Sequence, residues 1–485
     1  MSKFQKLIST KNTLSNVFFF SVLEFLKPAI GIFLLPLYMK ELSTEDYGIL
    51  SLVLVFSSFI GVLASFKLDT AIRTYYFDYN SNEKDLWNYI SQIFTVVLSI
   101  SIGITLLLLL IGPVLFDLIF NSGSIIFYPL GLIAVLTSII TAICTVFFIY
   151  LKNKVELKKF LFYSLLHVVL TLVIQVVLVI GFEMKIKGVL YGSLFSILIV
   201  FIAILLRNPK LINFKWQKKL IVPSLKFSIP LVPLSLLLVF GKQIDKVLIE
   251  RFMDLGNVGV YSVLMTLVGV SLLSIGALSN GIRPFLYQSL KNNNQEAKAT
   301  TDLFKGFYLF VGLISISGVI LLGCNLNIFT SNESYLAVQE YIVWAAISII
   351  PFFLVGFLNI LIVYHKKSKS LTIGMFIQAI TAFVLMMILI PYLGIYGAIT
   401  SLAISQVINF IVFTKALNNV ATFRVSFYNE FLKIGLFLTI VLSLFFMLFD
   451  WNITVFSIVQ FVSVLIILIF LDKKRLLRLI NFDIQ

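Results

Sequence analysis

The sequence predicts an all-α polytopic membrane protein with fourteen transmembrane helices, and three observations lead to this prediction. Of the 485 residues, 60% are apolar and only 12% are charged, whereas a soluble domain carries about 25% charged residues. The mean hydropathy is +1.05. Apolar runs long enough to cross a bilayer recur along the whole chain, and no stretch is polar enough to form a water-exposed domain. This pattern excludes a soluble enzyme and an extramembrane catalytic module.

The predicted spans follow these apolar runs in order. They cover residues 14–38, 46–66, 88–112, 125–150, 160–182, 188–206, 224–250, 258–282, 303–324, 336–362, 371–391, 395–416, 428–449 and 453–471. The first run follows a basic start, MSKFQKLISTK, and it is too long for a secretory signal and lacks a small-residue cleavage site. We therefore expect an uncleaved first span.

The distribution of lysine and arginine predicts the orientation. With the N-terminus placed in the cytoplasm, 30 of the 37 basic residues lie in or near inner segments. The remaining seven are Lys40, Lys185, Lys187 and Arg251 in outer loops, and Lys27, Lys242 and Lys246 within spans. Basic residues concentrate on the cytoplasmic side of membrane proteins. A miscount by one helix would reverse every later loop, so this asymmetry favours fourteen spans with both ends in the cytoplasm.

Net charge and motifs exclude several classes of function. The net charge of +15 would suggest nucleic acid for a soluble protein, but here it indicates basic loops beside anionic membrane lipids, so no nucleic-acid partner is expected. Cys144 and Cys324 lie in apolar stretches and are interpreted as packing residues. The sequence contains no Walker A motif, HExxH, GxSxG or acidic metal cluster. We therefore predict a protein that is not an enzyme and has no metal or cofactor.

An internal repeat divides the chain. Residues 244–263 (IDKVLIERFMDLGNVGVYSV) resemble residues 33–52 (FLLPLYMKELSTEDYGILSL), and residues 278–287 resemble residues 68–77, at displacements of 211 and 210. The displacement contains six spans, so the copies have the same orientation. Two pseudo-symmetric six-helix lobes around a central cleft, suited to alternating access, are predicted with two extra C-terminal helices. The predicted domains are an N-terminal lobe at 1–206, a basic cytoplasmic linker at 207–226, a C-terminal lobe at 227–418, and the last two helices with a basic tail at 419–485.

Charged residues occur within the first helix of each predicted lobe. Glu24 and Lys27 lie roughly 15 to 20 Å along the first span, near mid-membrane, and Lys242, Asp245 and Lys246 occupy the repeat-related span. A charge near the bilayer centre costs about 2.5 to 3.5 kcal/mol on insertion scales, so it is expected to face a cavity or a partner. We expect the lysines to bind an anionic substrate group and the carboxylates to serve ion coupling. The alternative is structural ion pairing, with Lys246 reaching outward to the interface.

Four further residues are candidates for the same pathway. Asp69 and Arg73 lie at the inner end of the second span, and Arg283 is the repeat equivalent of Arg73. A guanidinium at each inner mouth can hold a phosphate through two hydrogen bonds. The alternative is a positive-inside anchor in which Arg73 has Asp69, at i, i+4 spacing, as its local partner. His167 is a candidate proton relay. Intramembrane polar residues such as His167, Gln175 and Gln378 equally often form hydrogen bonds between helices.

Four segments carry a resemblance to a known family. They are NVFFFSVLEFLKPAIGIFLLPLYMKELSTEDYGILSLV at 16–53, LDTAIRTYYFDY at 68–79, SIPLVPLSLLLVFGKQIDKVLIERFMDLGNVGVYS at 228–262 and GIYGAITSLAISQ at 394–406, the last with its first-lobe counterpart IKGVLYGSL at 186–194. With them the sequence resembles the Wzx-type lipid-linked oligosaccharide flippases of the multidrug/oligosaccharidyl-lipid/polysaccharide exporter superfamily. The resemblance extends over essentially the whole chain, through diffuse apolar patterns rather than a catalytic signature.

The resemblance implies a function. It implies that an undecaprenyl-pyrophosphate-linked glycan unit moves from the cytoplasmic to the outer leaflet of the bacterial inner membrane, for O-antigen, capsule or a related polysaccharide. It also implies a polysaccharide polymerase and a chain-length regulator as partners, besides membrane lipids, and coupling to a Na⁺ or H⁺ gradient or to substrate supply. In fourteen-span relatives the last two spans lie outside the lobes, where they can guide the lipid tail.

Three alternatives remain open at this point. Within transport, these are an ion-coupled multidrug antiporter and a lipid II flippase. From a different class, a membrane glycan polymerase would need a sizeable outer loop for catalysis, and the outer loops here are short.

Overall fold

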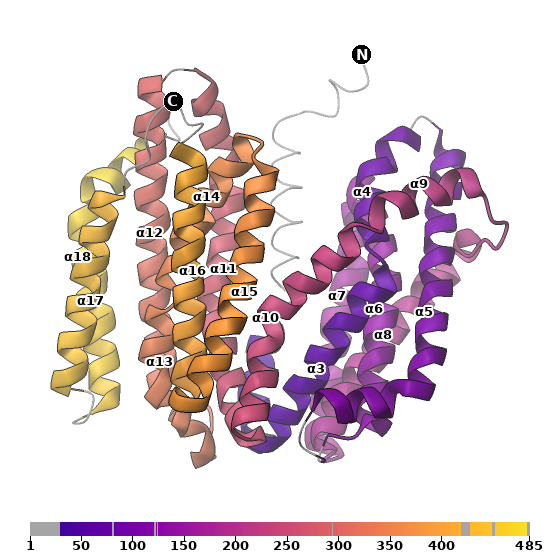
Figure 1. The fold of residues 1–485 in the computed structure, drawn as a ribbon, viewed down its shortest axis with the longest axis horizontal. Coiled ribbons are helices and arrows are strands. Elements are labelled where there is room, and N and C mark those ends of the chain that lie inside the picture. Colours follow the sequence, from indigo (N-terminus) through magenta and orange to yellow (C-terminus); the bar gives the residue numbers. More distant parts are fainter. Residues whose placement is uncertain are drawn as a thin grey trace. The chain divides into compact units, whose positions relative to one another are not determined.

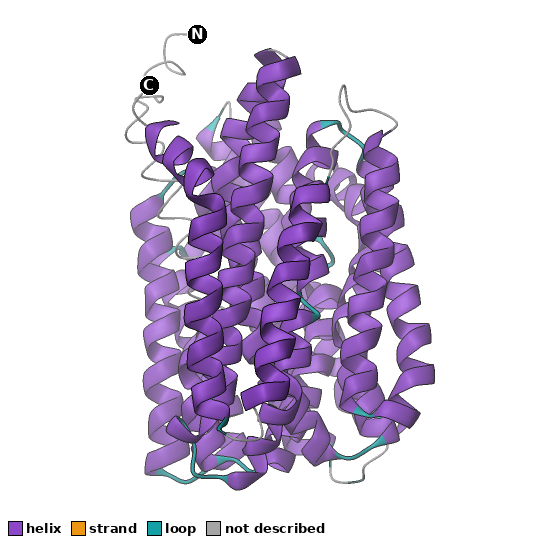
Figure 2. Cartoon of the chain, turned by 90° about the vertical axis from the view of Figure 1, so that its left-hand side faces the viewer, coloured by secondary structure: helices purple, strands orange, loops and turns teal. Residues whose placement is uncertain are grey.

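The computed structural model is helical wherever regular structure is described (Figure 2). The described residues are 30–79, 82–120, 123, 125–292, 294–418, 427–448 and 452–482. By their internal contacts they belong to two compact units, Met1–Gly259 and Val260–Gln485. Figure 1 traces the helices of each unit. The predicted all-α polytopic class is confirmed.

Unit 1 contains the elements from the N-terminus to the first residues of α11. After a helix at 30–41 come α3 (Thr44–Ser65), α4 (Leu68–Tyr79), α5 (Glu83–Ile119), a π-helical turn (Phe127–Gly131) leading into α6 (Leu132–Asn153), α7 (Leu157–Val176) with a second such turn (Val177–Gly181), α8 (Lys185–Arg207), a short 3₁₀ turn (Pro209–Leu211), α9 (Lys218–Ser228) and α10 (Leu231–Phe252). Within this unit α3 packs on α6 and α10, and α7 packs on α8.

Unit 2 begins inside α11 and continues to the C-terminus. Its elements are α11 (Leu255–Asn292), α12 (Asn294–Cys324), 3₁₀ turns at Leu326–Ile328 and Glu333–Ala337, α13 (Val338–Ile347), α14 (Ile350–Tyr364), α15 (Ser368–Leu393), α16 (Ile395–Asn418), α17 (Tyr428–Leu448) and α18 (Ile453–Phe482). The helices α15 and α16 form a closely packed hairpin, and α18 packs on α12.

The predicted spans coincide with helices wherever the structure describes them. Ten helical segments among the described residues are long and apolar enough to cross a membrane, and α9 with α10, bent by 42°, would make an eleventh. The first predicted span lies mostly outside the described residues, and each of the other thirteen contains a helix. The total of fourteen spans stays a prediction.

The bend between α9 and α10 lies at Pro230, the N-cap residue of α10. Proline lacks the backbone N–H that would continue the helical ladder, and its ring crowds the preceding turn. The predicted single run at 224–250 is therefore a broken helix whose first part, α9, carries a more polar sequence than α10.

The predicted lobes and the contact-based units divide the chain differently. The linker was predicted to precede the second lobe, and α10 was predicted to begin it. In the structure α10 contacts α3 and belongs to the unit of residues 1–259. The lobes were defined by the sequence repeat rather than by packing. The predicted domain boundaries therefore stay a prediction.

Local geometry at the starts of α3 and α11 follows the repeat. The Ser43 side chain accepts a hydrogen bond from the Asp46 backbone N–H at 3.0 Å, and Asp254 accepts one from the Asn257 N–H at 2.7 Å. Both are N-cap bonds that satisfy a donor left over at the helix start. Each pair of equivalent positions is separated by the displacement of 211 that the sequence repeat predicts.

The same two helix starts cross at a pair of glycines. A Cβ on Gly48 would lie 2.1 Å from the carbonyl oxygen of Leu255, and a Cβ on Gly259 would lie 1.9 Å from that of Thr44. Thr44 and Leu255 are themselves repeat equivalents, so the contact is reciprocal. Only glycine allows the two backbones to approach this closely.

Buried polar side chains link neighbouring helices inside unit 1. Gln175 donates from Nε2 to Ser193 Oγ at 2.7 Å and accepts from the Tyr38 hydroxyl at 2.7 Å. In unit 2, Asn409 donates to Gln378 Oε1 at 3.1 Å. The interpretation of Gln175 and Gln378 as helix-to-helix hydrogen-bonding residues is therefore correct. Such bonds satisfy polar groups that lipid cannot.

Candidate functional site

The first candidate pair, Glu24 and Lys27, lies outside the described residues. Their assigned roles in substrate binding and ion coupling therefore stay predictions. The remaining candidates fall on four helices, α4, α7, α10 and α11. The first three belong to unit 1, and Arg283 belongs to unit 2.

The residues Lys242, Asp245 and Lys246 lie along one stretch of α10. Asp245 is 5% exposed, and its Oδ1 accepts a hydrogen bond from the Lys246 backbone N–H at 2.8 Å. Lys246 is half-buried and Lys242 is exposed. The helix thus places a buried carboxylate one turn from an exposed ammonium. This supplies the two kinds of group that the sequence analysis assigned to ion coupling and to anion binding.

The second group lies where α3 passes into α4. Phe66 and Lys67 adopt left-handed backbone conformations, with φ of 46° and 55°, and these end α3. Lys67 Nζ lies 4.0 Å from Asp69 Oδ1. Arg73, one turn further along α4, is exposed. The local partner expected for Asp69 was Arg73, and the structure shows an ion pair of Asp69 with Lys67 that the spacing argument missed.

Arg283 is exposed on α11, in the part of that helix that belongs to unit 2. One turn before it, Ser279 Oγ lies 3.0 Å from the Tyr308 hydroxyl of α12. Tyr308 also donates to the Ile275 carbonyl at 3.1 Å. These bonds fix α11 against α12 next to Arg283. The guanidinium is therefore carried by a firmly packed helix while its side chain stays accessible.

His167 is half-buried on α7. Its backbone carbonyl accepts a hydrogen bond from Thr171 Oγ1 at 2.7 Å, and Thr171 in turn contacts Ser196 Oγ of α8 at 2.9 Å. His167 therefore lies one turn before a polar contact between α7 and α8. Its role as a proton relay stays a prediction.

Ion pairs among the described residues gather at the loop that joins α6 to α7. Lys154 Nζ lies 2.7 Å from Glu83 Oε1 and 3.1 Å from Glu156 Oε1, and Lys159 pairs with Glu156 at 2.5 Å. Burial alone would lower the pKa of Lys154, but its hydrogen bonds to Glu83, Tyr150 and Glu156 outweigh burial and raise that pKa. Burial would likewise raise the pKa of Glu156, but Lys159 and Lys154 lower it. Lys154 therefore stays charged and ties α5 to the loop.

His365 follows α14 in the basic loop that precedes α15. The sequence analysis leaves it no role. The structure shows it half-buried, with its ring at 83° to that of Tyr364. Burial and the nearby charge of Lys367 lower the pKa of His365 below its ordinary value of 6.5. The imidazole is therefore neutral at neutral pH.

This gives a prediction for the pH dependence of folding. The unfolded chain binds the His365 proton more readily than the folded protein, so stability is complete above pH 6.5 and falls as the pH drops toward the lower folded pKa. Lys367→Gln removes a repelling charge and is expected to raise the His365 pKa. Histidine-selective NMR titration checks this, with His365→Asn to assign the signal because the chain has two histidines. An unchanged or lower pKa in Lys367→Gln would contradict it.

Two polar arrangements were missed by the sequence analysis. Lys305, counted there among the basic residues in or near inner segments, has a side chain that is 5% exposed. It pairs with Glu430 of α17 at 3.2 Å and with Asp302 at 2.9 Å. Gln92 and Thr95 of α5 are fully buried and bind the segment after α8. The i, i+3 spacing of Asp302 and Lys305 was a usable signal, whereas Glu430 is 125 residues away in sequence from Lys305.

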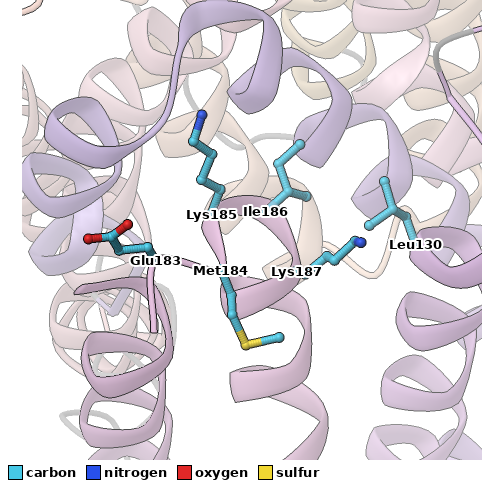
Figure 3. A pocket seen from close by; sticks show the side chains of 6 residues that line it. All are labelled: Leu130, Glu183, Met184, Lys185, Ile186 and Lys187. Atoms are coloured by element: carbon cyan, nitrogen blue, oxygen red, sulfur yellow. The ribbon is translucent and has the colours of Figure 1, made fainter. Parts of the chain in front are cut away.

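Lys185 and Lys187, two of the lysines assigned to outer loops, line a surface hollow of about 370 Å³. Figure 3 shows Lys187 and Leu130 facing each other across it, with Glu183, Met184, Lys185 and Ile186 on the same loop and helix start. Lys185 also lies 4.0 Å from Asp46. Within the described ranges, no three or more His, Cys, Asp and Glu side chains lie together so that they could hold a metal ion.

The fold and the apolar helices together define a multi-pass integral membrane protein. A family model described as "Polysaccharide biosynthesis protein" matches residues 41–316, more than half of the chain. The chain therefore belongs to this polysaccharide biosynthesis family, in agreement with the resemblance found in the sequence. No curated protein matches it in sequence.

Solved structures share its fold. The lipid II flippase MurJ in an inward closed conformation matches with a TM-score of 0.70 and 16% identity, covering 94% of this chain and 99% of that one. An inward-facing multidrug resistance MATE family transporter matches with 0.65 and 13%, covering 81% and 96%. The bent form of the Vibrio cholerae MATE transporter VcmN matches with 0.51 and 14%, covering 85% and 98%. At these identities the likeness establishes the fold.

Proposed function

We propose that this protein is a flippase that moves undecaprenyl-pyrophosphate-linked oligosaccharide units from the cytoplasmic to the outer leaflet of the bacterial inner membrane by alternating access. The observation that supports this most is α10, a span-forming helix with a buried carboxylate, Asp245, between Lys242 and Lys246. Charges inside an apolar span mark a pathway for polar cargo. The family match directs the proposal to polysaccharide synthesis.

Each candidate residue has a role in this proposal. Cationic side chains hold the pyrophosphate, because charge-assisted hydrogen bonds to phosphate are stronger than neutral ones. These residues are Lys27, Arg73, Lys242, Lys246 and Arg283. The carboxylates Glu24, Asp69 and Asp245 serve ion coupling or line the path, and His167 relays a proton if the coupling ion is H⁺.

The surrounding system is also proposed. The glycan is delivered for O-antigen, capsule or a related polysaccharide, and a polymerase and a chain-length regulator act on it after translocation. Energy comes from a Na⁺ or H⁺ gradient or from substrate supply, without a bound cofactor. The apolar helices α17 and α18 offer a surface for the lipid tail.

The experiment replaces Arg73, Arg283 and Asp245 singly by alanine and measures surface polysaccharide at matched protein levels. Loss of a charged contact to phosphate costs about 1.5 to 3 kcal/mol, so export is expected to fall at least about tenfold in Arg73→Ala and Arg283→Ala. Export is also expected to fall in Asp245→Ala, because this variant lacks the proposed coupling carboxylate. Lys366→Ala, an exposed basic residue in another loop, is the matched control and should export normally. If all three variants export like the parent, the site assignment is wrong.

A lipid II flippase is the second candidate, favoured by the match to MurJ over 94% of this chain. Depletion of the protein separates the two. Arrested growth with lost cell-wall synthesis indicates lipid II as cargo, whereas viable cells without surface glycan indicate the proposed function. An ion-coupled multidrug antiporter, suggested by the MATE matches, would instead exchange organic cations for Na⁺ or H⁺ in vesicles.

A further inference from the structure

The segment between α8 and α9 carries positive charge without any compensating acid. The chain has no Asp or Glu between Glu183 and Asp245. Within this stretch the segment after α8 exposes four lysines, Lys210, Lys215, Lys218 and Lys219. A surface of this kind attracts an acidic partner.

Two large aromatic side chains project from the same segment. Phe214 is 62% exposed and Trp216 is 53% exposed. Together with Lys215 between them they form what is here called the aromatic tip (Phe214, Lys215 and Trp216). Exposed aromatic side chains beside lysines are the composition that proteins place at the membrane–water boundary.

The aromatic tip is held rigidly at both ends by one face of α5. On one side, the Asn213 backbone N–H donates to Thr95 Oγ1 at 2.9 Å, and Gln92 Nε2 donates to the Asn213 carbonyl at 3.2 Å. On the other side, the Gln217 N–H donates to Gln92 Oε1 at 3.0 Å, and Asn88 Nδ2 donates to Gln217 Oε1 at 2.9 Å. The three α5 residues are spaced at i, i+4 and i+7, so they share one helix face.

The hydrogen bonds to Asn88, Gln92 and Thr95 explain why the aromatic side chains of the tip remain exposed. Hydrogen bonds fix the residues on either side of the tip, so its aromatic rings are not free to fold onto the protein. Asn88, Gln92 and Thr95 lie in the first turns of α5, where the predicted span at 88–112 begins. The aromatic tip is therefore located at the level where the apolar part of this helix begins.

The helix that follows is bound to the same part of unit 1. Ser224 Oγ of α9 lies 3.0 Å from the Tyr89 hydroxyl of α5, and Ser228 Oγ donates to the Lys67 carbonyl at 3.1 Å. Figure 1 shows α9 at the same end of unit 1 as α4. On its outer side α9 exposes Val222 and Lys226. The basic and apolar surface thus continues from the tip onto α9.

We propose that the aromatic tip and its lysines dock unit 1 onto the acidic phospholipids of the adjacent leaflet. The rings enter the headgroup region, and Lys210, Lys215, Lys218 and Lys219 bind lipid phosphates. Charge complementarity favours an acidic lipid over a basic or neutral partner. Each lysine near an acidic membrane surface raises the binding affinity about fivefold. The inference is independent of the cargo and of translocation.

The test measures the depth of spin labels on the full-length protein in nanodiscs. Cysteine is introduced by Phe214→Cys or, independently, by Trp216→Cys; the native Cys144 and Cys324 are buried and remain unlabelled. The accessibility of the spin label to oxygen and to a water-soluble nickel chelate reports its depth in the membrane. Nanodiscs contain phosphatidylcholine alone or phosphatidylcholine with phosphatidylglycerol. A label at Lys84→Cys, an exposed position near the start of α5, gives the water-accessible reference.

In nanodiscs that contain phosphatidylglycerol, the label at position 214 or 216 is expected to lie within the headgroup region. In nanodiscs without that lipid, the same label is expected to lie closer to water. The triple variant Lys215→Gln, Lys218→Gln, Lys219→Gln should lose the depth shift. Removing an equal charge by Lys366→Gln, Lys367→Gln, Lys369→Gln in another loop should leave the shift intact.

Three outcomes overturn the proposal. In the first, the tip label is as accessible to water as the reference in every nanodisc. In the second, the label lies equally deep with and without phosphatidylglycerol. In the third, the label is protected from water only in native membranes. The last outcome would assign the surface to a protein partner. Since no transport is measured, failure here leaves the proposed function standing.

Discussion

Gly259→Ala and Gly48→Ala are each expected to destabilise the folded protein by about 1 to 3 kcal/mol, the range for forcing extra volume into a packed contact. The new Cβ atoms would lie 1.9 Å and 2.1 Å from the carbonyl oxygens of Thr44 and Leu255. Backbone atoms cannot rotate away as a flexible side chain can. The two helix starts must therefore separate. Thermal unfolding in detergent, followed by size-exclusion chromatography, measures the effect.

Two comparisons make this result specific. Gly269→Ala, on the same α11, meets open space around its new Cβ and should leave the unfolding temperature unchanged or raise it, since alanine favours helix. The double variant Gly48→Ala, Gly259→Ala should lose less stability than the sum of the singles, because one substitution already spreads the shared crossing. Strict additivity, or no loss in either single variant, would contradict the reciprocal contact.

Glu430→Gln is expected to cost about 3 kcal/mol, because it removes a buried anion from a buried cation. This is the low end of the range for a broken buried ion pair, since Lys305 keeps Asp302 as a second partner. The Glu430 and Lys305 side chains are 1% and 5% exposed and lie 3.2 Å apart. The ring of Phe427 lies 5.2 Å from the Lys305 ammonium and helps to exclude solvent. Loss of the pair should also loosen α17 from α12. Thermal unfolding, together with protease access to α17, measures both effects.

The paired substitution Lys305→Met, Glu430→Leu provides the control. Replacing both members of a buried ion pair by apolar residues of similar size is often neutral, so most of the lost stability should return. Glu83→Gln removes the partner of Lys154 from an exposed ion pair, with Glu83 79% exposed, and should change little. Equal losses from Glu430→Gln and Glu83→Gln would show that burial does not govern the α12–α17 contact.

Two further buried contacts show why α17 and α18 belong to the packed part of unit 2. Gln460 Nε2 of α18 donates to Ser317 Oγ of α12 at 3.0 Å, and Asn325 Nδ2 donates to Ser457 Oγ at 2.8 Å. With the Lys305–Glu430 pair, α12 and Asn325, the residue that follows it, hold the last two helices at three points. Hydropathy identified α17 and α18 as spans, but their polar residues gave no indication of this partner.

Several features of the fold were accessible from sequence because they depend on local physics. Apolar runs of span length identify helices in any membrane protein, since each backbone polar group must bond within its own helix. The repeat at a displacement of 211 aligned Ser43 with Asp254, and the structure shows an N-cap hydrogen bond at each. It also aligned Gly48 with Gly259, although only the structure shows that these glycines contact the opposite helix.

The candidate site was predicted less completely. Asp69 was paired with Arg73 by helical spacing, but the left-handed turn at Phe66 and Lys67 brings Lys67 to the carboxylate instead. Backbone reversals of this kind change which side chains meet, and they depend on packing. The assignments of Asp245 and Lys242 rest on charge within a span, and that of Arg283 rests on its equivalence to Arg73 in the repeat. The export measurements test Asp245 and Arg283.

The amino-acid sequence by itself determined that the chain is a helical, multi-pass membrane protein, where most of its spans lie and which of them carry charge, because hydropathy and helical periodicity act over a single turn or span. Only the tertiary structure decided that Lys305 is buried against Glu430, that Asn88, Gln92 and Thr95 hold out an aromatic tip, and that two glycines meet opposite carbonyl groups. These contacts join residues that are far apart in sequence, and their energies depend on distance and burial, which composition and spacing do not contain.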